Sequence, residues 1–508
     1  MTTYTITLQP TGHTLTAPAG TPLRDLLFEQ GVEFPCGGQG RCRGCKVRVV
    51  AGEAALTPEQ ETRLTAAEIA SGWRLACRLF LHSDLTLELR QWDAAILSHE
   101  GDFTFSPRPG LGVAVDLGTT TLVAQLLDLQ TSQVLAVRTA LNAQARYGAD
   151  VMSRIGFAIA DDGQAVLTRT IRDQIGKLLR DLIFAAQVEP SRVQEAVIVG
   201  NTAMHHLFCG IDVRPLAQVP FTPLDDGLQV MDGAALGWHT TPDMTVHFLP
   251  CLGGFVGSDL LAGVLATNLD RRDALTMLVD LGTNGEIVLG NRDGLLCAST
   301  AAGPAFEGAR IGMGMRAATG AISAVKNVDG QAVCHVLGNV APAGICGSGL
   351  VDAVAVGLEL GVIRPNGRLA TGGDRWELAP PVAISQTDIR QLQLAKGAIA
   401  AGIRLLLDEW GAQPDDVSEL VLAGAFGNYV KRISARRIGL LKFPPERVTP
   451  LGNTALLGAK LALFAGDTDE ARHQAIRAMT QHRTLSDDPR FMEVYVDEMG
   501  FPRGEEAI

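Results

Sequence analysis

Four cysteines near the start of the chain carry the spacing that points most directly to chemistry. Cys36, Cys42, Cys45 and Cys77 follow the pattern C-x5-C-x2-C-x31-C, whereas the other five of the nine cysteines are scattered. An odd number of cysteines in a long chain does not suggest a disulfide framework, and clustered thiols are typical of metal or redox sites. The spacing therefore predicts that these four thiolates bind metal, and the other five are expected to pack as small apolar residues.

The spacing resembles that of plant-type [2Fe–2S] ferredoxins, in which C-x4-C-x2-C is followed by a distant fourth cysteine. The first gap is longer here by one residue. Glycines fill the loop between the first three ligands, where a chain wrapped around a cluster needs positive φ angles and amide groups turned toward sulfur. Zinc is the alternative occupant, but zinc ligands usually come as two C-x2-C knuckles and only one such pair is present. The pattern favours a [2Fe–2S] cluster.

The sequence around the cysteines predicts a small α+β module. Alternating residues indicate strands at 3–10, 13–18, 46–50 and 85–89. A short helix is expected to begin at Thr21-Pro22, because proline is favoured in a first helical turn. We expect a ferredoxin-like β-grasp domain over residues 1–92. Residues 93–110 have turn-forming residues and a Pro-x-Pro exit, so they are interpreted as a linker that spans roughly 60 Å if fully extended.

The rest of the chain contains one pattern twice. A β-branched run leads into Asp116-Leu117-Gly118-Thr119-Thr120-Thr121, and a similar run leads into Asp280-Leu281-Gly282-Thr283-Asn284-Gly285. Strand character resumes after each turn. Each copy is followed much later by a helix, a buried strand and a glycine turn, at residues 195–207 and 419–430. The repetition indicates an internal duplication.

Turns of this composition suit nucleotide phosphates. Backbone amides and hydroxyls at a Gly/Thr turn converge where phosphate oxygens can be held without a basic residue. An aspartate at the end of the strand can hold Mg²⁺ through its waters and position an attacking water. Two such hairpins facing each other could grip a triphosphate from both sides, and the turn GAFG at 424–427 would let adenine approach the backbone closely.

These residues resemble the ASKHA superfamily of acetate and sugar kinases, Hsp70 and actin. DLGTTT, DLGTNGE and LAGAFGNY look like its phosphate-1, phosphate-2 and adenosine motifs. More closely, GNTAMHHLF, LPCLGGFVGSD, TAAGPAFEGA, GICGSGLVDAV, LQLAKGAIAAGI and GNTALLGAK, joined to an N-terminal [2Fe–2S] domain, resemble the reductive activators of corrinoid proteins. The resemblance covers nearly the whole chain.

The resemblance implies a duplicated α/β ASKHA ATPase fold, with a first half at 111–275 and a second half with a C-terminal tail at 276–508. It implies an ATP-hydrolysing iron–sulfur electron transferase with a [2Fe–2S] cluster, ATP and Mg²⁺ as cofactors. Members of this family use ATP to drive a low-potential electron from the cluster onto inactive Co(II), which restores Co(I) for methyl transfer. The implied partners are a corrinoid (cobalamin-binding) protein of a methyltransferase system and an electron donor that the sequence does not identify.

The resemblance also implies residue roles. Asp116 and Asp280 would be catalytic, by handling Mg²⁺ and the attacking water. The residues expected to bind nucleotide are Gly118, Thr119, Thr120, Gly282, Thr283, Asn284, Gly303, Glu307, Gly424, Ala425 and Gly427.

One departure from larger family members concerns the region between the two modules. Those members insert linker and middle domains there, whereas only about 93–110 is available in this chain. The middle domain is therefore expected to be missing, which leaves open whether the protein is a homodimer. The C-terminal tail contains no cysteine, so activators with a C-terminal ferredoxin of two [4Fe–4S] clusters match less well.

Composition excludes some classes of partner. The 508 residues include 55 acidic and 43 basic side chains, a net charge of −12, which argues against binding to nucleic acid. The start lacks a basic segment followed by an apolar core, and no run of about 18 apolar residues follows, so a soluble cytoplasmic protein without membrane contact is expected. The alternative function is nucleotide-gated electron transfer to a different low-potential metalloenzyme. A sugar or acid kinase would leave the four cysteines unexplained.

Several single residues invite chemical interpretations that the sequence does not favour. His205 and His206 are adjacent on a helix and point about 100° apart, which favours a structural or cleft-lining role over metal binding. Asp259 opens an apolar run in the manner of a helix N-cap. Lys396 could reach nucleotide or a carboxylate, but a surface lysine fits its pattern at least as well. Cys251 and Cys346 are expected to pack against nearby backbone.

Overall fold

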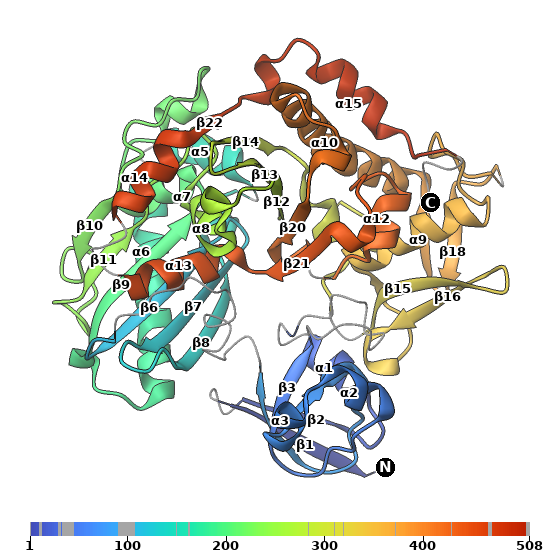
Figure 1. Ribbon diagram of the computed structural model, residues 1–508, viewed down its shortest axis with the longest axis horizontal. Coiled ribbons are helices and arrows are strands. Elements are labelled where there is room, and N and C mark those ends of the chain that lie inside the picture. Colours follow the sequence, from blue (N-terminus) through green and yellow to red (C-terminus); the bar gives the residue numbers. More distant parts are fainter. Residues whose placement is uncertain are drawn as a thin grey trace.

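Three sheets organise the chain, one in the N-terminal module and one in each half of the larger body (Figure 1). The computed structural model describes residues 2–9, 13–28, 32, 45–89, 107–148, 150–160, 163–282, 284–308, 310–317, 320–370, 372–427, 429–465 and 470–503. The predictions for Cys36, Cys42 and Thr283 lie outside these ranges, as do most of the expected linker and the side chains of Glu307 and Ala425. Within the described residues, no helix is long and apolar enough to cross a membrane.

The N-terminal module is a β-grasp, as predicted. Its elements are β1 (Thr3–Gln9), β2 (His13–Pro18), α1 (Leu23–Phe28), β3 (Lys46–Ala51), α2 (Pro58–Arg63), α3 (Ala66–Ala70), β4 (Trp73–Leu75) and β5 (Leu85–Leu89). The strand order is β2-β1-β5-β3-β4, with β1 and β5 parallel at the centre. Apolar residues of the alternating strands, such as Ile6, Leu8 and Val47, are buried together with Leu23 and Leu27 of α1. The four strands predicted from alternation are therefore confirmed as β1, β2, β3 and β5.

The larger body contains two sheets with the same core topology. The first half has β6 (Leu111–Leu117), β7 (Thr121–Asp128), β8 (Val134–Leu141), β9 (Val193–Gly200), β10 (Gln229–Asp232) and β11 (Thr245–Phe248), in the order β10-β11-β9-β6-β7-β8. The second half has β12 (Thr276–Leu281), β13 (Gly285–Asn291), β14 (Gly294–Thr300), β20 (Glu419–Ala423), β21 (Val448–Gly452) and β22 (Thr480–His482), in the order β21-β20-β12-β13-β14-β22. In each sheet an antiparallel hairpin, β6–β7 or β12–β13, is joined on its other side by a parallel strand, β9 or β20. The predicted duplication is confirmed.

Helices cover both sheets and also fill the space between them (Figure 1). The helices of the first half are α5 (Val151–Ile159), α6 (Gly163–Ala186), α7 (Thr202–Cys209) and α8 (Ser258–Thr267). Those of the second half are α9 (Gly347–Glu359), α10 (Gln386–Trp410), α11 (Gly424–Gly427), α12 (Arg432–Arg437), α13 (Thr454–Ala465), α14 (Glu470–Met479) and α15 (Phe491–Met499). Helices α8 and α13 are apolar nearly all round, and such helices are buried. A Cβ on Gly458 would lie 2.0 Å from the Ala262 carbonyl oxygen, so this glycine permits their close contact.

Small sheets extend the second half and contact the N-terminal module. They consist of β15 (Ala321–Val328), β16 (Gln331–Val336) and β17 (Gly344–Ile345), and of β18 (Arg375–Ala379) with β19 (Val382–Ser385). Helix α1 lies beside the end of β16 (Figure 1). The buried Asp25 carboxylate is 3.0 Å from Nε2 of His335 on β16, and Arg24 also contacts this imidazole. The ferredoxin module is therefore seated against the second half through side chains of α1.

Lys396 is fully buried, so its interpretation as a surface lysine is wrong. Its Nζ donates to the Gly500 carbonyl oxygen at 2.6 Å and lies 5.8 Å from the centroid of the Phe501 ring. This lysine therefore ties α10 to the residues that follow α15. Burial lowers its pKa to about 7, because the charged amine has lost its water.

Replacing Lys396 with methionine is expected to flatten the dependence of stability on pH. The ordinary pKa of lysine is 10.5, so between pH about 7 and 10.5 the unfolded chain binds the proton more tightly than the folded chain. The unfolding free energy of the wild type should therefore rise with pH across this window, by up to about 1.4 kcal/mol per pH unit from this group. Urea unfolding at pH 7, 8 and 9 would measure the slope. Equal slopes in wild type and variant would contradict a buried, poorly solvated amine.

Candidate functional site

A cavity of about 390 Å³ opens where the two hairpins face each other. The sequence-predicted residues that line it are Asp116, Gly118, Thr119, Thr120, Asp280, Gly282, Asn284 and Gly424. The duplicated turns thus meet although 164 residues separate Asp116 from Asp280 in the sequence. The expectation of one site built from both halves agrees with this geometry.

Not every predicted nucleotide residue lines the cavity. Gly303 and Gly427 are absent from its walls among the described residues. Gly424 has a positive φ of 83°, and a Cβ there would lie 2.5 Å from Oδ1 of Asp280. The glycine turn therefore approaches the second hairpin so closely that a side chain at this position would collide with it.

Side-chain amides hold the first hairpin turn and the aspartate that precedes it. Asn142 Nδ2 donates to the Gly118 carbonyl oxygen at 3.0 Å, and Asn201 Nδ2 donates to Thr119 Oγ1 at 2.8 Å. Asn453, which directly precedes α13, donates from Nδ2 to Asp116 Oδ2 at 2.7 Å. The C-terminal part of the chain therefore orients a carboxylate of the first half.

Among the described residues, four carboxylates line the cavity, and two of them were not among the predicted site residues. Asp259 and Glu286 line it together with Asp116 and Asp280. The N-cap of α8 is Gly257, so the expected N-cap role of Asp259 is wrong. Asp259 Oδ1 accepts from the amide of Leu260 at 2.9 Å. Glu286 lies directly opposite Asp280 in the β12–β13 ladder. Counting outward from the hairpin turn could have identified Glu286 from sequence.

Burial raises the pKa values of these carboxylates, and at three of them neighbouring negative charges add to the shift. Burial, as the larger cause, raises the pKa of Asp116 to about 6 and that of Asp280 to about 7, and neighbouring negative charges add to the shift at Asp280. Burial and the same neighbours raise the pKa values of Asp259 and Glu286. Crowded like charges of this kind are relieved by protons or by a cation. Among the described residues, no three Cys, His, Asp or Glu side chains are close enough to hold a metal ion by themselves.

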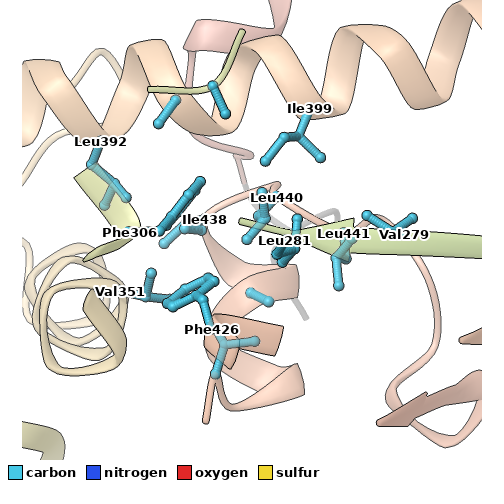
Figure 2. Close-up of a cluster of buried hydrophobic side chains, with 14 of the residues drawn as sticks. Val279, Leu281, Phe306, Val351, Leu392, Ile399, Phe426, Ile438, Leu440 and Leu441 are labelled. Carbon is cyan, nitrogen blue, oxygen red and sulfur yellow. The ribbon is translucent and has the colours of Figure 1, made fainter. Parts of the chain in front are cut away.

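The far end of the cavity is apolar. Phe306, from the TAAGPAFEGA segment, and Phe426 of α11 stack with ring centroids 4.6 Å apart and planes 25° apart. Figure 2 shows both rings in a buried cluster with Val351 of α9 and Leu281 at the end of β12. A flat apolar wall of this kind suits an aromatic base. Cys346 is buried, in agreement with the expected packing role, but it also borders the cavity.

A buried ionic cluster fixes α12 and the residues before it against α9. The Asp352 carboxylate on α9 is paired with Lys431, accepts from Ser434 Oγ at 2.6 Å and accepts from the Val325 amide at 3.2 Å. Because Tyr429, which lies close to Lys431 in sequence, lines the cavity, this cluster positions the wall next to Phe426.

Two of the four cysteines predicted to be ligands are described, and their thiols lie close together. Cys45 at the start of β3 and Cys77 after β4 have their Sγ atoms 3.4 Å apart, far beyond a disulfide bond. Thiolates bound to one metal at about 2.3 Å in tetrahedral geometry lie roughly 3.7 Å apart. The separation therefore fits two ligands of the same metal ion.

His205 and His206 are structural. His205 Nε2 is 3.1 Å from the Gly227 carbonyl oxygen, and His206 Nδ1 is 2.9 Å from the Thr202 carbonyl oxygen. Both rings are fully buried, and neither borders the cavity. Cys251 is likewise fully buried, as expected.

Comparison with known proteins agrees with this arrangement. Family models match residues 6–82 as a 2Fe-2S iron-sulfur cluster binding domain, 111–272 as the RACo middle region and 274–507 as the C-terminal, ASKHA domain of RACo. The fold and these matches define an iron–sulfur module joined to an ASKHA body.

Individual relatives extend over most of the chain. The corrinoid activation enzyme RamQ of Eubacterium limosum is 36% identical over 420 residues, 77% of this chain and 70% of RamQ. The [Co(II) methylated amine-specific corrinoid protein] reductase of Methanosarcina barkeri is 28% identical over 77% of each chain. The solved structure of a reductive activator for corrinoid, iron-sulfur protein matches with a TM-score of 0.71 and 28% identity over 98% of each chain. The chain belongs to the family of reductive activators of corrinoid proteins.

The family models correct one expectation. The middle region was expected to be missing, but its model matches residues 111–272, which form the first half of the duplicated body. The short segment between the modules therefore does not imply loss of that region.

Proposed function

We propose that this protein is an ATP-dependent reductive activator that reduces the inactive Co(II) form of a corrinoid protein to Co(I). The observation that carries the proposal is one chain holding both a thiolate pair suited to a metal cluster and a carboxylate-lined cavity between duplicated hairpins. The [2Fe–2S] cluster, held by Cys36, Cys42, Cys45 and Cys77, supplies the low-potential electron when bound. The partner is a cobalamin-binding protein of a methyltransferase system in the cytoplasm.

The cavity residues divide the work on ATP. Asp116 and Asp280 would hold Mg²⁺ and orient the attacking water, and Glu286 and Asp259 would contribute charge to the same cation. The turn residues around Thr119 bind phosphate through amides and hydroxyls. The cation neutralises carboxylates that otherwise repel one another and the triphosphate, so metal and nucleotide should bind together.

Nucleotide is needed because transfer of the electron from the cluster to Co(II) is thermodynamically unfavourable. A plant-type cluster has a reduction potential of about −400 mV. Each 59 mV or so by which the potential of the acceptor lies below that of the cluster lowers the equilibrium constant for transfer of one electron tenfold. A complex that binds ATP and ADP with different affinities can favour the reducible state of the cobalt site while ATP is bound. It can then return to its starting state after hydrolysis.

An anaerobic reduction assay tests the proposal. Reduced protein, ATP and a candidate Co(II) corrinoid protein of a methyltransferase system should together give the absorbance of Co(I), and the corrinoid protein should change the rate of ATP hydrolysis. Reactions with ADP or without nucleotide are the controls. No Co(I), together with an unchanged hydrolysis rate, would contradict corrinoid activation and favour a different metalloenzyme as acceptor.

Binding of Mg–ATP is expected to weaken as the pH falls from about 8 to about 5.5. Below pKa values of about 7 at Asp280 and about 6 at Asp116, the cation must displace protons before it can use these carboxylates. Each carboxylate that must lose a proton lowers the apparent affinity for Mg–ATP by up to about tenfold for every pH unit below its pKa. Calorimetric titration at several pH values would measure this. Asp280→Asn should reduce the change near pH 7, to which Asp259 also contributes. A profile unaltered by that substitution would contradict a contribution from Asp280.

A further inference from the structure

Arg154 of α5 is a buried charge that the proposed chemistry does not yet use. Its side chain is 0% exposed. The guanidinium donates from Nη2 to the Thr119 carbonyl oxygen at 2.6 Å and from Nε to the Gly148 carbonyl oxygen at 2.9 Å, and Nη1 lies 3.6 Å from the sulfur of Met204. All of these acceptors are uncharged.

The charge of Arg154 has no carboxylate partner within the described parts of the chain. The Asp150 carboxylate exerts some attraction, but its Oδ1 caps α5 by accepting from the Ser153 amide at 2.8 Å. Burial lowers the pKa of Arg154 to about 10, so the guanidinium remains charged at neutral pH. Burying an unpaired charge costs several kcal/mol, which calls for a compensating anion.

The position of Arg154 shows where that anion would sit. The Thr119 carbonyl belongs to the turn whose other side lines the cavity, so the guanidinium lies behind the wall where phosphate is expected. Among the described lining residues, four are carboxylates and one, Arg316, is a cation. The cavity itself therefore offers little positive charge to a triphosphate.

We propose that Arg154 is the positioning residue for nucleotide phosphate at the first hairpin. Arg154 binds the Thr119 carbonyl on the side away from the cavity, which leaves the amides of the turn facing the ligand. The phosphate on the opposite side of the turn then balances the charge of the guanidinium. Asn142 and Asn201 hold the same turn without charge, so Arg154 alone adds an electrostatic contribution. The inference rests on the proposed nucleotide function.

Comparing the binding of ATP with that of adenosine in Arg154→Gln distinguishes an effect of the arginine charge on phosphate from a general disturbance of the structure. ATP affinity is expected to fall at least about tenfold, because a buried charge acts on phosphate through a poorly screening medium. Adenosine affinity should change less than about twofold, since adenosine carries no phosphate. Arg154→Lys keeps the charge and loses the forked donor geometry, so its ATP affinity should lie between those of wild type and the glutamine variant.

Arg172→Gln is the matched control. Arg172 lies on α6 in the same half and donates from Nε to the Phe208 carbonyl oxygen at 2.7 Å, and it does not line the cavity. This control should leave ATP affinity unchanged. Equal losses of ATP and adenosine binding in Arg154→Gln, or unchanged ATP binding, would overturn the inference and leave the nucleotide function intact. A wild type that binds neither ligand would overturn both.

Discussion

Asp280→Asn is expected to abolish ATP hydrolysis while leaving the iron–sulfur absorbance spectrum intact. Asp280 is the penultimate residue of β12, lines the cavity and stands opposite Glu286 in the hairpin ladder. The substitution keeps the shape of the side chain but removes the charge proposed to hold Mg²⁺ and to orient water. Loss of one such electrostatic contact typically lowers kcat by about 100-fold or more. Steady-state hydrolysis and the visible spectrum of the same preparation would measure both properties.

Asp293→Asn is the control for this experiment. Asp293 is exposed at the tip of the next hairpin, between β13 and β14, outside the cavity. Its replacement should leave hydrolysis unchanged. Full activity in Asp280→Asn would contradict the catalytic role of this residue. Loss of both hydrolysis and the iron–sulfur spectrum would instead contradict the separation of the two modules.

Cys77→Ser should produce the opposite result, with loss of the [2Fe–2S] spectrum and of Co(I) formation but retention of ATP hydrolysis. The Cys77 thiol lies 3.4 Å from that of Cys45, and none of the described residues that line the cavity comes from this module. Mutation of even an outer-shell partner of a metal ligand typically lowers metal affinity about tenfold to 100-fold. Removing a ligand itself should therefore reduce the cluster content at least about tenfold. Iron analysis, visible absorbance and the anaerobic cobalt assay would report the loss.

Cys334→Ser serves as the thiol control. Cys334 is a half-buried residue of β16, directly before His335, and it lies outside the predicted ligand set. This variant should retain both the cluster and Co(I) formation. Normal cluster content in Cys77→Ser would show that this residue is not a ligand. Hydrolysis that disappears with the cluster would show that the nucleotide site depends on the ferredoxin module.

Local chemistry determined what could be predicted from sequence. The spacing of the cysteines and the glycine-rich loop between them predicted an iron–sulfur module, which the family match confirms. The duplicated Asp-Leu-Gly-Thr turns predicted two equivalent hairpins, and both sheets contain them in the same strand order. Such signals are readable because a tight turn or a ligand loop constrains only neighbouring residues.

Only the tertiary structure decided what each turn would meet. Asp259 has the sequence context of a helix cap, yet it lines the cavity beside Asp116 and Asp280, which belong to the two different hairpins. Lys396 has the pattern of a surface lysine, yet the segment after α15 covers it and supplies an acceptor from 104 residues away. Arg154 lies 35 residues after the turn that it holds. These contacts depend on how distant segments pack, and packing is a property of the assembled sheets and helices that no local pattern encodes.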